Sequence, residues 1–528
     1  MTDENWWRGA ITYQIYPRSF QDDNGDGVGD LRGITRRLGH VADLGVDAIW
    51  LSPFFTSPMA DMGYDVADHR DVDPVFGTLA DFDALMARAH ELGLKVIIDQ
   101  VLSHTSDQHA LFQESRSSRD NPKADWYLWR DAKPDGTPPN NWQAIFGGPA
   151  WTWDVRRRQY YYHSFLAAQP DLNFHVPEVQ DWVLDAMRFW LDRGVDGFRL
   201  DTVNLYFQDK ELRDNPVDHR MKNEPDYKTY EMQYPLHSKN QPENVVFVER
   251  MRALTDEYDA RVLIGEIGES HRPAEIKAEY TTGARLHMAY DFALLTHVFT
   301  AEHLRRQVQV AFHEMPGGWP CWAFSNHDVP RHVSRWAHAG ADQDRLAMLA
   351  CALLMSMQGS ICIYQGEELG LTQAELSYDE LRDPEGLTFW PDHPGRDGCR
   401  TPMPWEAEAP HAGFSDADTT WLPVKPPHVA RAVDGQAGDP ESVLAFYRRM
   451  IAFRRDRADL RDGDTRFLDA AAPVLAFRRG QGTWCAFNLG PGRARADLPG
   501  ASEILLGLDA TLAGSAVELG PNGFAICA

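Results

Sequence analysis

One short apolar segment, residues 197–201, carries an arginine and an aspartate two positions apart. Side chains two positions apart on a β-strand point to the same face, so Arg199 and Asp201 are expected to lie together. The positive charge of a guanidinium favours the ionised form of a neighbouring carboxylate. An ionised carboxylate at the C-terminal end of a buried strand suits nucleophilic attack on a sugar carbon. A structural ion pair without chemistry explains the same two residues, so the decision rests on the other strand ends.

Two further carboxylates, Glu266 and Asp328, follow other short apolar runs. With Asp201 they place three carboxylates at three predicted strand ends, whereas glycoside cleavage with retained configuration needs two. We assign Asp201 as the nucleophile and Glu266 as the acid/base, whose pKa should be raised by burial near other carboxylates. Asp328 would hold sugar hydroxyls and stabilise the positively charged transition state. Glu269 is the rival for the acid role, but Glu266 is preferred because it ends its strand directly.

Two histidines stand close to these positions in the sequence. His104 ends the segment Asp99–His104, and His327 directly precedes Asp328. An imidazole N–H can donate a hydrogen bond to a sugar hydroxyl. A histidine that satisfies its hydrogen bonds inside the core explains each of the two residues equally well.

The elements that must position these side chains are short apolar runs separated by amphipathic stretches. The predicted strands are Ile11–Tyr16, Asp47–Ser52, Lys95–Val101, Gly197–Asp201, Val262–Glu266, His287–Phe292, Cys321–Asn326 and Ser360–Tyr364. Helical patterns lie at Gly33–Leu44, Leu79–Leu92, Val179–Arg193, Val245–Tyr258 and Gln343–Ser356. Eight strands that alternate with helices predict an α/β fold, a (β/α)8 TIM barrel, whose strand ends meet at one mouth. A doubly wound open sheet is the alternative, but no Gly-rich phosphate turn follows the first strand.

Two segments depart from this alternation before the chain changes character near its end. Residues 105–173, rich in Trp, Tyr, Pro and Gly, predict a small inserted domain over the barrel mouth after the third strand. Residues 206–242 predict a lid-forming loop. Short strand-like runs between turn residues predict a C-terminal antiparallel β domain at residues 461–528. The barrel itself is therefore assigned to residues 1–104 and 174–460.

Composition limits the classes of partner. A net charge of −26 argues against nucleic acids and anionic membranes and is compatible with a neutral substrate. The N-terminal residues lack the basic and apolar regions of a secretory signal, and no run of about 18 apolar residues predicts a membrane span. No metal-type spacing occurs among the cysteines, so we expect reduced thiols in a cytoplasmic protein at Cys321, Cys351, Cys362, Cys399, Cys485 and Cys527. Both a monomer and a homodimer stay open.

An acidic, Gly-rich segment is a candidate metal site. Oxygen-bearing groups recur at alternate positions, namely the side chains of Asp22, Asn24, Asp26 and Asp30 and the carbonyl oxygen of Val28. This spacing resembles the first half of an EF-hand loop, and hard cations prefer such oxygen ligands. The absence of a nearby cysteine or histidine disfavours zinc. We predict a structural Ca²⁺, with Mg²⁺ second, and no organic cofactor; an acidic turn without an ion is the alternative.

Four blocks of the sequence resemble those of the α-amylase family, glycoside hydrolase family 13. The blocks are DQVLSH (Asp99–His104), GFRLDTVN (Gly197–Asn204), GE (Gly265–Glu266) and SNHD (Ser325–Asp328). Further matches lie at Trp6–Phe20, around Tyr64, at Gln169–Phe174 and at Arg400–Trp405. The resemblance therefore extends from the N-terminus through about residue 405.

The resemblance implies an α-retaining mechanism with the three carboxylates in the roles given above. It implies that the reacting sugar is surrounded by Arg199, His104, His327 and a stacking Tyr64. Asp61 and Arg400 resemble the pair that binds the hydroxyl at the non-reducing end in exo-acting glucosidases, although a turn-forming role also explains Asp61. Phe146 and Phe165 resemble aromatic contacts to bound sugars, and core packing explains them almost as well.

Two signals bear on the preferred linkage, and they disagree. The segment Gln169–Phe174 resembles the oligo-1,6-glucosidase group, whereas Thr202, directly after the nucleophile, resembles the maltase side. Thr202 receives more weight because its side chain lies beside the aglycone site, where Val is typical of α-1,6 enzymes. One departure from the family pattern is Ser103, where Asn usually precedes the histidine of the first block. This departure changes the local hydrogen bonding without touching the carboxylates.

The expected function is a retaining, exo-acting α-glucosidase for short α-1,4-linked substrates, with glucosyl transfer to alcohol or phenol acceptors. The alternatives within the fold are an oligo-1,6-glucosidase, a sucrose- or trehalose-converting isomerase and an endo-acting amylase. The pair Asp61 and Arg400 argues against the amylase, and the arginine-rich loop motif of sucrose isomerases has no match between Asn326 and Trp405. A non-catalytic binding protein, like the transporter heavy chains that share this barrel, is disfavoured because all three carboxylates are kept.

Overall fold

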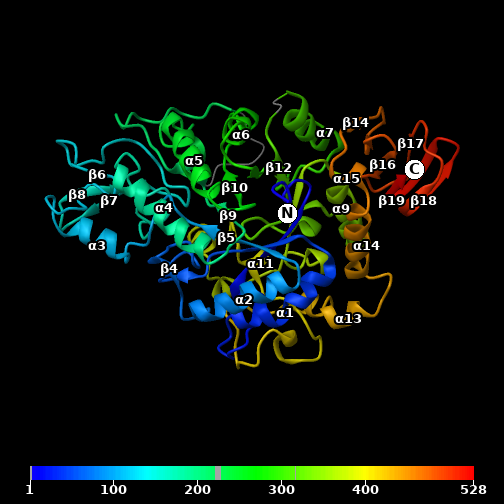
Figure 1. The fold of residues 1–528 in the computed structure, drawn as a ribbon, viewed down its shortest axis with the longest axis horizontal. Coiled ribbons are helices and arrows are strands. Elements are labelled where there is room, and N and C mark those ends of the chain that lie inside the picture. Colours follow the sequence, from blue (N-terminus) through cyan, green and yellow to red (C-terminus); the bar gives the residue numbers. More distant parts are fainter. Residues whose placement is uncertain (1–2, 221–227, 315–316) are drawn as a thin grey trace.

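The computed structural model describes residues 3–220, 228–314 and 317–528. Parallel strands close into a barrel in the order β1-β13-β12-β11-β10-β9-β5-β2, with helices around it (Figure 1). These strands are β1 (Ile11–Ile15), β2 (Ala48–Leu51), β5 (Lys95–Gln100), β9 (Gly197–Leu200), β10 (Val262–Ile267), β11 (Met288–Asp291), β12 (Pro320–Trp322) and β13 (Ser360–Tyr364). The predicted (β/α)8 barrel is confirmed, and each of the eight predicted runs overlaps an observed strand.

The barrel forms because its strands are short apolar runs that are buried on both faces, as parallel sheets require. All five residues of β1 are buried, and β1 pairs with both β13 and β2, which closes the sheet. β12 is shorter than the predicted run because the chain leaves the ladder after Trp322. Beyond it, the side chain of Asn326 accepts the backbone N–H groups of Asp328 and Val329. That turn carries Asp328 to the mouth of the barrel.

The long helices pack their apolar faces against the barrel. They are α1 (Leu31–Leu44), α2 (Leu79–Glu91), α4 (Pro177–Asp192), α5 (Pro242–Thr255), α6 (Pro273–Thr281), α7 (Ala301–Gln309), α9 (Gln343–Ser356) and α14 (Val443–Arg455). Local signals fix their ends: α2 begins with a capping box between Thr78 and Asp81, and α1 ends at Gly45 in the left-handed conformation. The five predicted helices are all present, with ends within three residues of those observed.

Shorter helices lie in the loops and around the last part of the barrel. They are α3 (Ala110–Ser117), α8 (His332–Trp336), α10 (Pro384–Phe389), α11 (Asp397–Arg400), α12 (Pro426–Val429), α13 (Val433–Ala437) and α15 (Ala458–Arg461). Of these, α10 and α11 follow β13 and bring charged side chains to the barrel mouth.

Smaller antiparallel sheets accompany the barrel. Within residues 105–173, the cyan part at the left of Figure 1, the sheet β6-β8-β7 consists of β6 (Trp129–Arg130), β7 (Trp151–Asp154) and β8 (Gln159–Tyr162). The C-terminal sheet, red in Figure 1, has the order β14-β15-β16-β19-β17 with β18 paired to β19. Its strands are β14 (Thr465–Phe467), β15 (Val474–Arg479), β16 (Thr483–Asn488), β17 (Ala494–Asp497), β18 (Ile504–Ala513) and β19 (Ala516–Cys527). The pair β3 (Phe55–Thr56) and β4 (Asp68–Val72) follows β2.

The loop between β9 and α5 contains the predicted lid, of which residues 221–227 lie outside the described residues. Its described part is bonded to the insertion: Trp142 Nε1 donates to the Arg213 carbonyl oxygen at 2.9 Å, and Thr229 Oγ1 donates to Gln143 Oε1 at 2.7 Å. The lid segment therefore lies against the inserted sheet.

Two expectations from composition concern the thiols and the membrane. All six cysteines are free and buried. None of the described helices has the length and apolar character needed to cross a membrane.

Candidate active site

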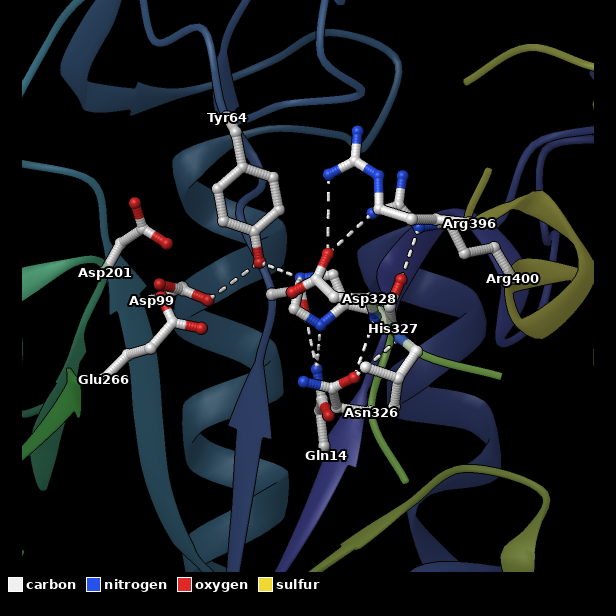
Figure 2. A network of polar contacts seen from close by, with 12 residues as sticks. Gln14, Tyr64, Asp99, Asp201, Glu266, Asn326, His327, Asp328, Arg396 and Arg400 are labelled. Atoms are coloured by element: carbon white, nitrogen blue, oxygen red, sulfur yellow. Dashed lines mark hydrogen bonds and ion pairs between the residues drawn. The ribbon is translucent and has the colours of Figure 1, made fainter. Parts of the chain in front are cut away.

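The side chain of Arg199, on β9, brings three carboxylates together. Its Nη1 lies 2.8 Å from Asp99 Oδ1 and 2.7 Å from Asp201 Oδ1, and its Nη2 contacts Glu266 Oε1. Figure 2 shows Asp99, Asp201 and Glu266 facing one another. Because the Arg199 side chain is only 1% exposed, these ion pairs are shielded from water. The prediction that Arg199 and Asp201 lie together is confirmed, and the same guanidinium also reaches Glu266.

Glu266 has the electrostatics of a proton donor. Burial raises the pKa of its carboxyl to about 8, with the charges of Asp201 and Asp328 acting in the same direction and that of Arg199 opposing them. Its Oε2 accepts the backbone N–H of Thr202 at 3.1 Å. A carboxyl with a raised pKa keeps its proton at neutral pH and can act as a general acid.

Glu269, the rival for the acid role, has the opposite electrostatics. Burial alone would raise its pKa, but the charge of Lys239 and the backbone N–H groups of Arg272 and His271 outweigh burial and lower it. The Arg272 N–H lies 3.0 Å from Glu269 Oε1. An ionised carboxylate that accepts backbone hydrogen bonds has a structural role, so the geometry favours Glu266 as the acid.

Asp328 lies among cations, as Figure 2 shows for Arg396 and Arg400. Arg400 Nη2 is 3.0 Å and Arg396 Nη1 is 3.4 Å from Asp328 Oδ1, and His327 Nε2 is 3.3 Å from Oδ2. Burial would raise the pKa of Asp328, but these neighbours outweigh it and lower the pKa to about 2. Burial also lowers the pKa of His327 to about 3, so its ring is neutral at pH 7 and the two arginines carry the effect. Asp328 is therefore ionised at neutral pH.

Tyr64 and His327 form a stacked pair beside Asp328, and Figure 2 shows the bond from the Tyr64 hydroxyl to this histidine. Their ring centroids are 5.3 Å apart and the planes differ by 7°. Gln14 Nε2 lies 2.8 Å from His327 Nδ1, and an amide nitrogen only donates, so Nδ1 accepts and Nε2 carries the ring proton. The Tyr64 hydroxyl then accepts from Nε2 and donates to Asp99 Oδ2 at 3.2 Å. These bonds tie the predicted stacking tyrosine to the carboxylate cluster.

A pocket of about 430 Å³ opens at the barrel mouth, within the size range of small-molecule sites. The predicted site residues that line it are Asp61, Tyr64, His104, Phe146, Phe165, Asp201, Thr202, Glu266 and Asp328. Three others are buried behind the wall, each in contact with a lining residue: Arg199 with Asp201, His327 with Tyr64, and Arg400 with Asp328. The structure thus gathers the residues selected from the sequence around one cavity.

Arg396, which sequence reasoning missed, is the cation that holds Asp61. Its Nη2 lies 2.7 Å from Asp61 Oδ1, while Arg400, the partner predicted from the sequence, donates to the His327 carbonyl oxygen at 2.7 Å and to Asp328. The guanidinium of Arg396 reaches the pocket over the ring of Phe146, 4.7 Å from its centroid, whereas Arg400 is fully buried on α11. The only signal for Arg396 was a second arginine four positions before Arg400.

The inserted segment supplies the aromatic wall of the pocket. The rings of Phe146 and Phe165 are 5.4 Å apart, and Phe165 lies 5.3 Å from the His104 ring. The same segment contributes Gln169, whose Nε2 donates to Asp61 Oδ2 at 3.1 Å. These contacts fix the insertion against the barrel mouth, so Phe146 and Phe165 face the cavity rather than a separate core.

The acidic loop at residues 22–30 is closed by its own backbone. Asp22 accepts the N–H groups of Gly25 and Gly27 at 2.8 Å each, and Asp30 caps α1 by accepting the Gly33 N–H at 2.7 Å. Over residues 3–220, 228–314 and 317–528, no cluster of three or more His, Cys, Asp or Glu side chains is positioned to hold a metal ion. The carboxylates of this loop are therefore engaged with its backbone, and the Ca²⁺ at Asp22, Asn24, Asp26, Val28 and Asp30 stays a prediction.

If the loop holds a cation, we expect chelation to lower the melting temperature by several degrees, because a ligand that binds only the folded state stabilises it. Differential scanning calorimetry with and without EDTA, together with elemental analysis, measures this. An unchanged curve and no bound metal would mean that the backbone hydrogen bonds of the loop are sufficient. An Asp26→Asn variant is the matched control, since it should remove the response to EDTA.

A (β/α)8 barrel with carboxylates at its mouth, one ion-paired and one of raised pKa, has the architecture of a glycoside-cleaving enzyme. Comparison with known proteins agrees with this class. Residues 14–463 match the profile of the α-amylase catalytic domain. The chain therefore belongs to the α-amylase family, glycoside hydrolase family 13, and is a glycosidase.

Individual relatives narrow the group within the family. A probable α-glucosidase of Rhizobium meliloti (strain 1021) is 56% identical over 506 residues, covering 94% of this chain and 92% of that protein. An oligo-1,6-glucosidase of Parageobacillus thermoglucosidasius is 37% identical over 486 residues, covering 85% and 84%. The crystal structure of XgtA, an α-glucosyl transfer enzyme, has a TM-score of 0.95 at 53% identity, covering 99% of both chains. These relatives are glucosidases and a glucosyl transfer enzyme.

Proposed function

We propose that this protein is a retaining, exo-acting α-glucosidase that removes the terminal glucose of short α-1,4-linked substrates through a covalent intermediate on Asp201. The observation that carries the proposal is the sharing of the Arg199 guanidinium, whose Nη1 binds Asp201 and whose Nη2 binds Glu266. One cation thereby serves both carboxylates that a retaining mechanism uses.

In the first half-reaction, the Glu266 carboxyl gives its proton to the glycosidic oxygen while an oxygen of Asp201 attacks the anomeric carbon. The bond from that carbon to the leaving sugar breaks as the bond to Asp201 forms, and the leaving sugar departs as an alcohol. Asp328, held ionised by Arg396 and Arg400, stabilises the positive charge that develops on the sugar ring.

In the second half-reaction, Glu266 acts as a base. Esterification removes the charge of Asp201, which is one of the groups that raise the pKa of Glu266, so this pKa falls once the intermediate forms. Of the two reacting carboxylates, one is charged in each state, first Asp201 and then Glu266, and Arg199 contacts both. Glu266 takes a proton from water, or from an alcohol or phenol acceptor, and the oxygen attacks the anomeric carbon with retention.

The pocket supports exo-action on small substrates. The ion pair between Asp61 and Arg396 joins the segment after β2 to the segment after β13 and closes one side of the pocket. Asp61 lines the pocket, and its two oxygens are held there by Arg396 and Gln169, where a sugar hydroxyl could donate to them. Thr202 lines the pocket next to Glu266, where the leaving group must lie, and supports a preference for the α-1,4 linkage. The oligo-1,6-glucosidase relative supports the α-1,6 linkage as the second candidate.

We expect kcat/KM to fall as pH rises through the pKa of Glu266, because burial raises that pKa to about 8 and only the protonated acid can donate. Above this pKa the carboxylate dominates, so the loss lies on the alkaline side. A profile of kcat/KM against pH for maltose measures this alkaline limb, the fall in kcat/KM above the pKa of Glu266. α-Glucosyl fluoride is the matched control: fluoride leaves without a proton, so the alkaline limb should disappear with this substrate. A maltose limb near about pH 5 would mean that Glu266 has an ordinary pKa.

Product analysis tests the function itself. The purified protein is incubated separately with maltose, isomaltose, sucrose, trehalose and soluble starch, with and without a phenol, and the anomers are followed by NMR. Release of α-glucose from maltose but not from starch is the expected result. Preference for isomaltose would assign the α-1,6 linkage, and isomerised sucrose or trehalose would assign an isomerase. Initial release of β-glucose from sucrose, whose leaving group is not glucose, would exclude a retaining mechanism.

A further inference from the structure

Thr202 is held in a conformation that β-branched residues rarely adopt. Its φ is 41° and its ψ is 45°, in the left-handed region, where a branched Cβ is crowded by the backbone. In this conformation the residue contacts both catalytic carboxylates: its N–H donates to Glu266 Oε2 at 3.1 Å, and its hydroxyl donates to Asp201 Oδ2 at 3.1 Å. Arg199 occupies the other oxygen of Asp201, Oδ1, so Thr202 fixes the rotation of the nucleophile.

The hydroxyl of Thr202 is in turn held by Ser103, from the loop after β5. Ser103 Oγ lies 3.1 Å from Thr202 Oγ1 and 2.9 Å from His104 Nδ1, and Ser103 is 1% exposed. The Thr202 hydroxyl has one proton and donates it to the Asp201 carboxylate. Between the Ser103 and Thr202 hydroxyls, Ser103 must therefore be the donor. Ser103 Oγ then accepts from His104 Nδ1–H. The hydrogen bonds therefore run in one direction, from His104 through Ser103 and Thr202 to Asp201.

The His104 ring, at the start of this series of hydrogen bonds, lines the pocket. Its Nε2 lies 3.2 Å from Gln169 Nε2 and 2.9 Å from the Tyr64 carbonyl oxygen. With the proton of a neutral ring on Nδ1, Nε2 accepts from Gln169 and makes no hydrogen bond to the Tyr64 carbonyl; a ring with a proton on Nε2 would donate to that carbonyl and could not accept from Gln169. Gln169 also donates to Asp61. The four-residue chain thus connects the nucleophile to the lining that faces the terminal sugar.

We propose that Ser103 is a positioning residue for the nucleophile, acting through the hydroxyl of Thr202 and setting the proton of His104 on Nδ1. The proposal rests on the proposed function, in which Asp201 attacks the anomeric carbon. Without the Ser103 hydroxyl, Thr202 Oγ1 loses its donor and His104 Nδ1 loses its acceptor in a site shielded from water. The Thr202 side chain can then rotate away from Asp201, and the nucleophile keeps only its contact with Arg199.

A double-mutant cycle between Ser103 and Thr202 tests this role. We expect Ser103→Ala to lower kcat for maltose about ten-fold with KM changed by less than about two-fold, the size expected of one buried hydrogen bond. In a Thr202→Val background, where no hydroxyl remains to be held, Ser103→Ala should lower kcat by less than about two-fold. Ser103→Thr, which restores a hydroxyl at the same position, should recover most of the activity.

Ser106→Ala is the matched control, because Ser106 is equally buried in the same loop and its hydroxyl accepts the Gln108 N–H at 3.1 Å, with no bond to Thr202 or His104 among the described residues. It should leave kcat unchanged, whatever it does to the melting temperature. Equal effects of Ser103→Ala in both Thr202 backgrounds, no effect in either, or a lower melting temperature with KM and kcat changed together would overturn the positioning role. The Asp201→Asn variant distinguishes the two proposals. If this variant keeps normal turnover, Asp201 is not the nucleophile and the proposed function fails. If it is inactive but the effects of Ser103→Ala and Thr202→Val on kcat are independent of each other, the proposed function stands and only the positioning role of Ser103 fails.

Discussion

Replacing Asp201 by Asn is expected to lower kcat by roughly 10⁴-fold or more while the protein stays folded, the scale seen when a nucleophile is removed. An amide carries no negative charge and cannot form the glucosyl ester, so the first half-reaction loses its covalent route. The shape of the side chain is kept, and its oxygen can still accept from Arg199 Nη1, which lies 2.7 Å from Asp201 Oδ1. Turnover of maltose and the melting temperature together measure the outcome.

The same strand offers a matched control for this variant. Asp196 lies at the opposite end of β9, where its carboxylate is bonded to His90 Nε2 at 2.7 Å and to Lys95 Nζ at 2.9 Å. Asp196→Asn removes a buried carboxylate of equal size far from the pocket and should cost stability without lowering kcat. Near-normal turnover of Asp201→Asn would exclude Asp201 as the nucleophile. An equal loss of turnover in both variants would mean that the loss comes from disturbing the barrel structure and not from removing the nucleophile.

The barrel and its carboxylates could be predicted because both depend on local patterns. Each barrel strand is a buried apolar run, and a residue at the end of such a run lies at the mouth whatever path the following loop takes. The period of two along β9 was enough to place Arg199 beside Asp201. The run that ends near Glu266 placed that carboxylate on the neighbouring strand, within reach of the same guanidinium.

The loop residues could not be predicted, because their contacts join distant parts of the chain. Asp61 and Arg396 are 335 positions apart, and Arg396 is directed by Asp383, to which it is bonded at 2.7 Å, rather than by any periodic pattern. Ser103 and Thr202 each stood out in the sequence, but they are 99 positions apart and their contact exists only in the fold. The left-handed conformation of Thr202 had no signal, since sequence propensity disfavours it for a β-branched residue.

The second large effect is expected for Glu266→Gln. Glutamine cannot donate a proton to the glycosidic oxygen, so we expect kcat/KM for maltose to fall by roughly 10³-fold, within the range for loss of general acid catalysis. An aryl α-glucoside with an acidic phenol needs little protonation and should lose much less in the first half-reaction. Glu269→Gln is the matched control: its carboxylate is already ionised, so both substrates should be affected equally or not at all. If Glu269→Gln, and not Glu266→Gln, lost far more activity on maltose than on the aryl glucoside, Glu269 would be the acid.

Added azide distinguishes an acid/base from a nucleophile at this position. With the aryl glucoside, Glu266→Gln should accumulate the glucosyl intermediate, because no base remains to deprotonate water. Azide needs no deprotonation and should restore turnover. It attacks the anomeric carbon from the face opposite Asp201, so the expected product is α-glucosyl azide, with the configuration of the substrate. Formation of β-glucosyl azide would mean that azide replaces a missing nucleophile, and the roles of Glu266 and Asp201 would be reversed. Since Arg199 contacts both carboxylates, this stereochemical result tests directly which of the two attacks the anomeric carbon.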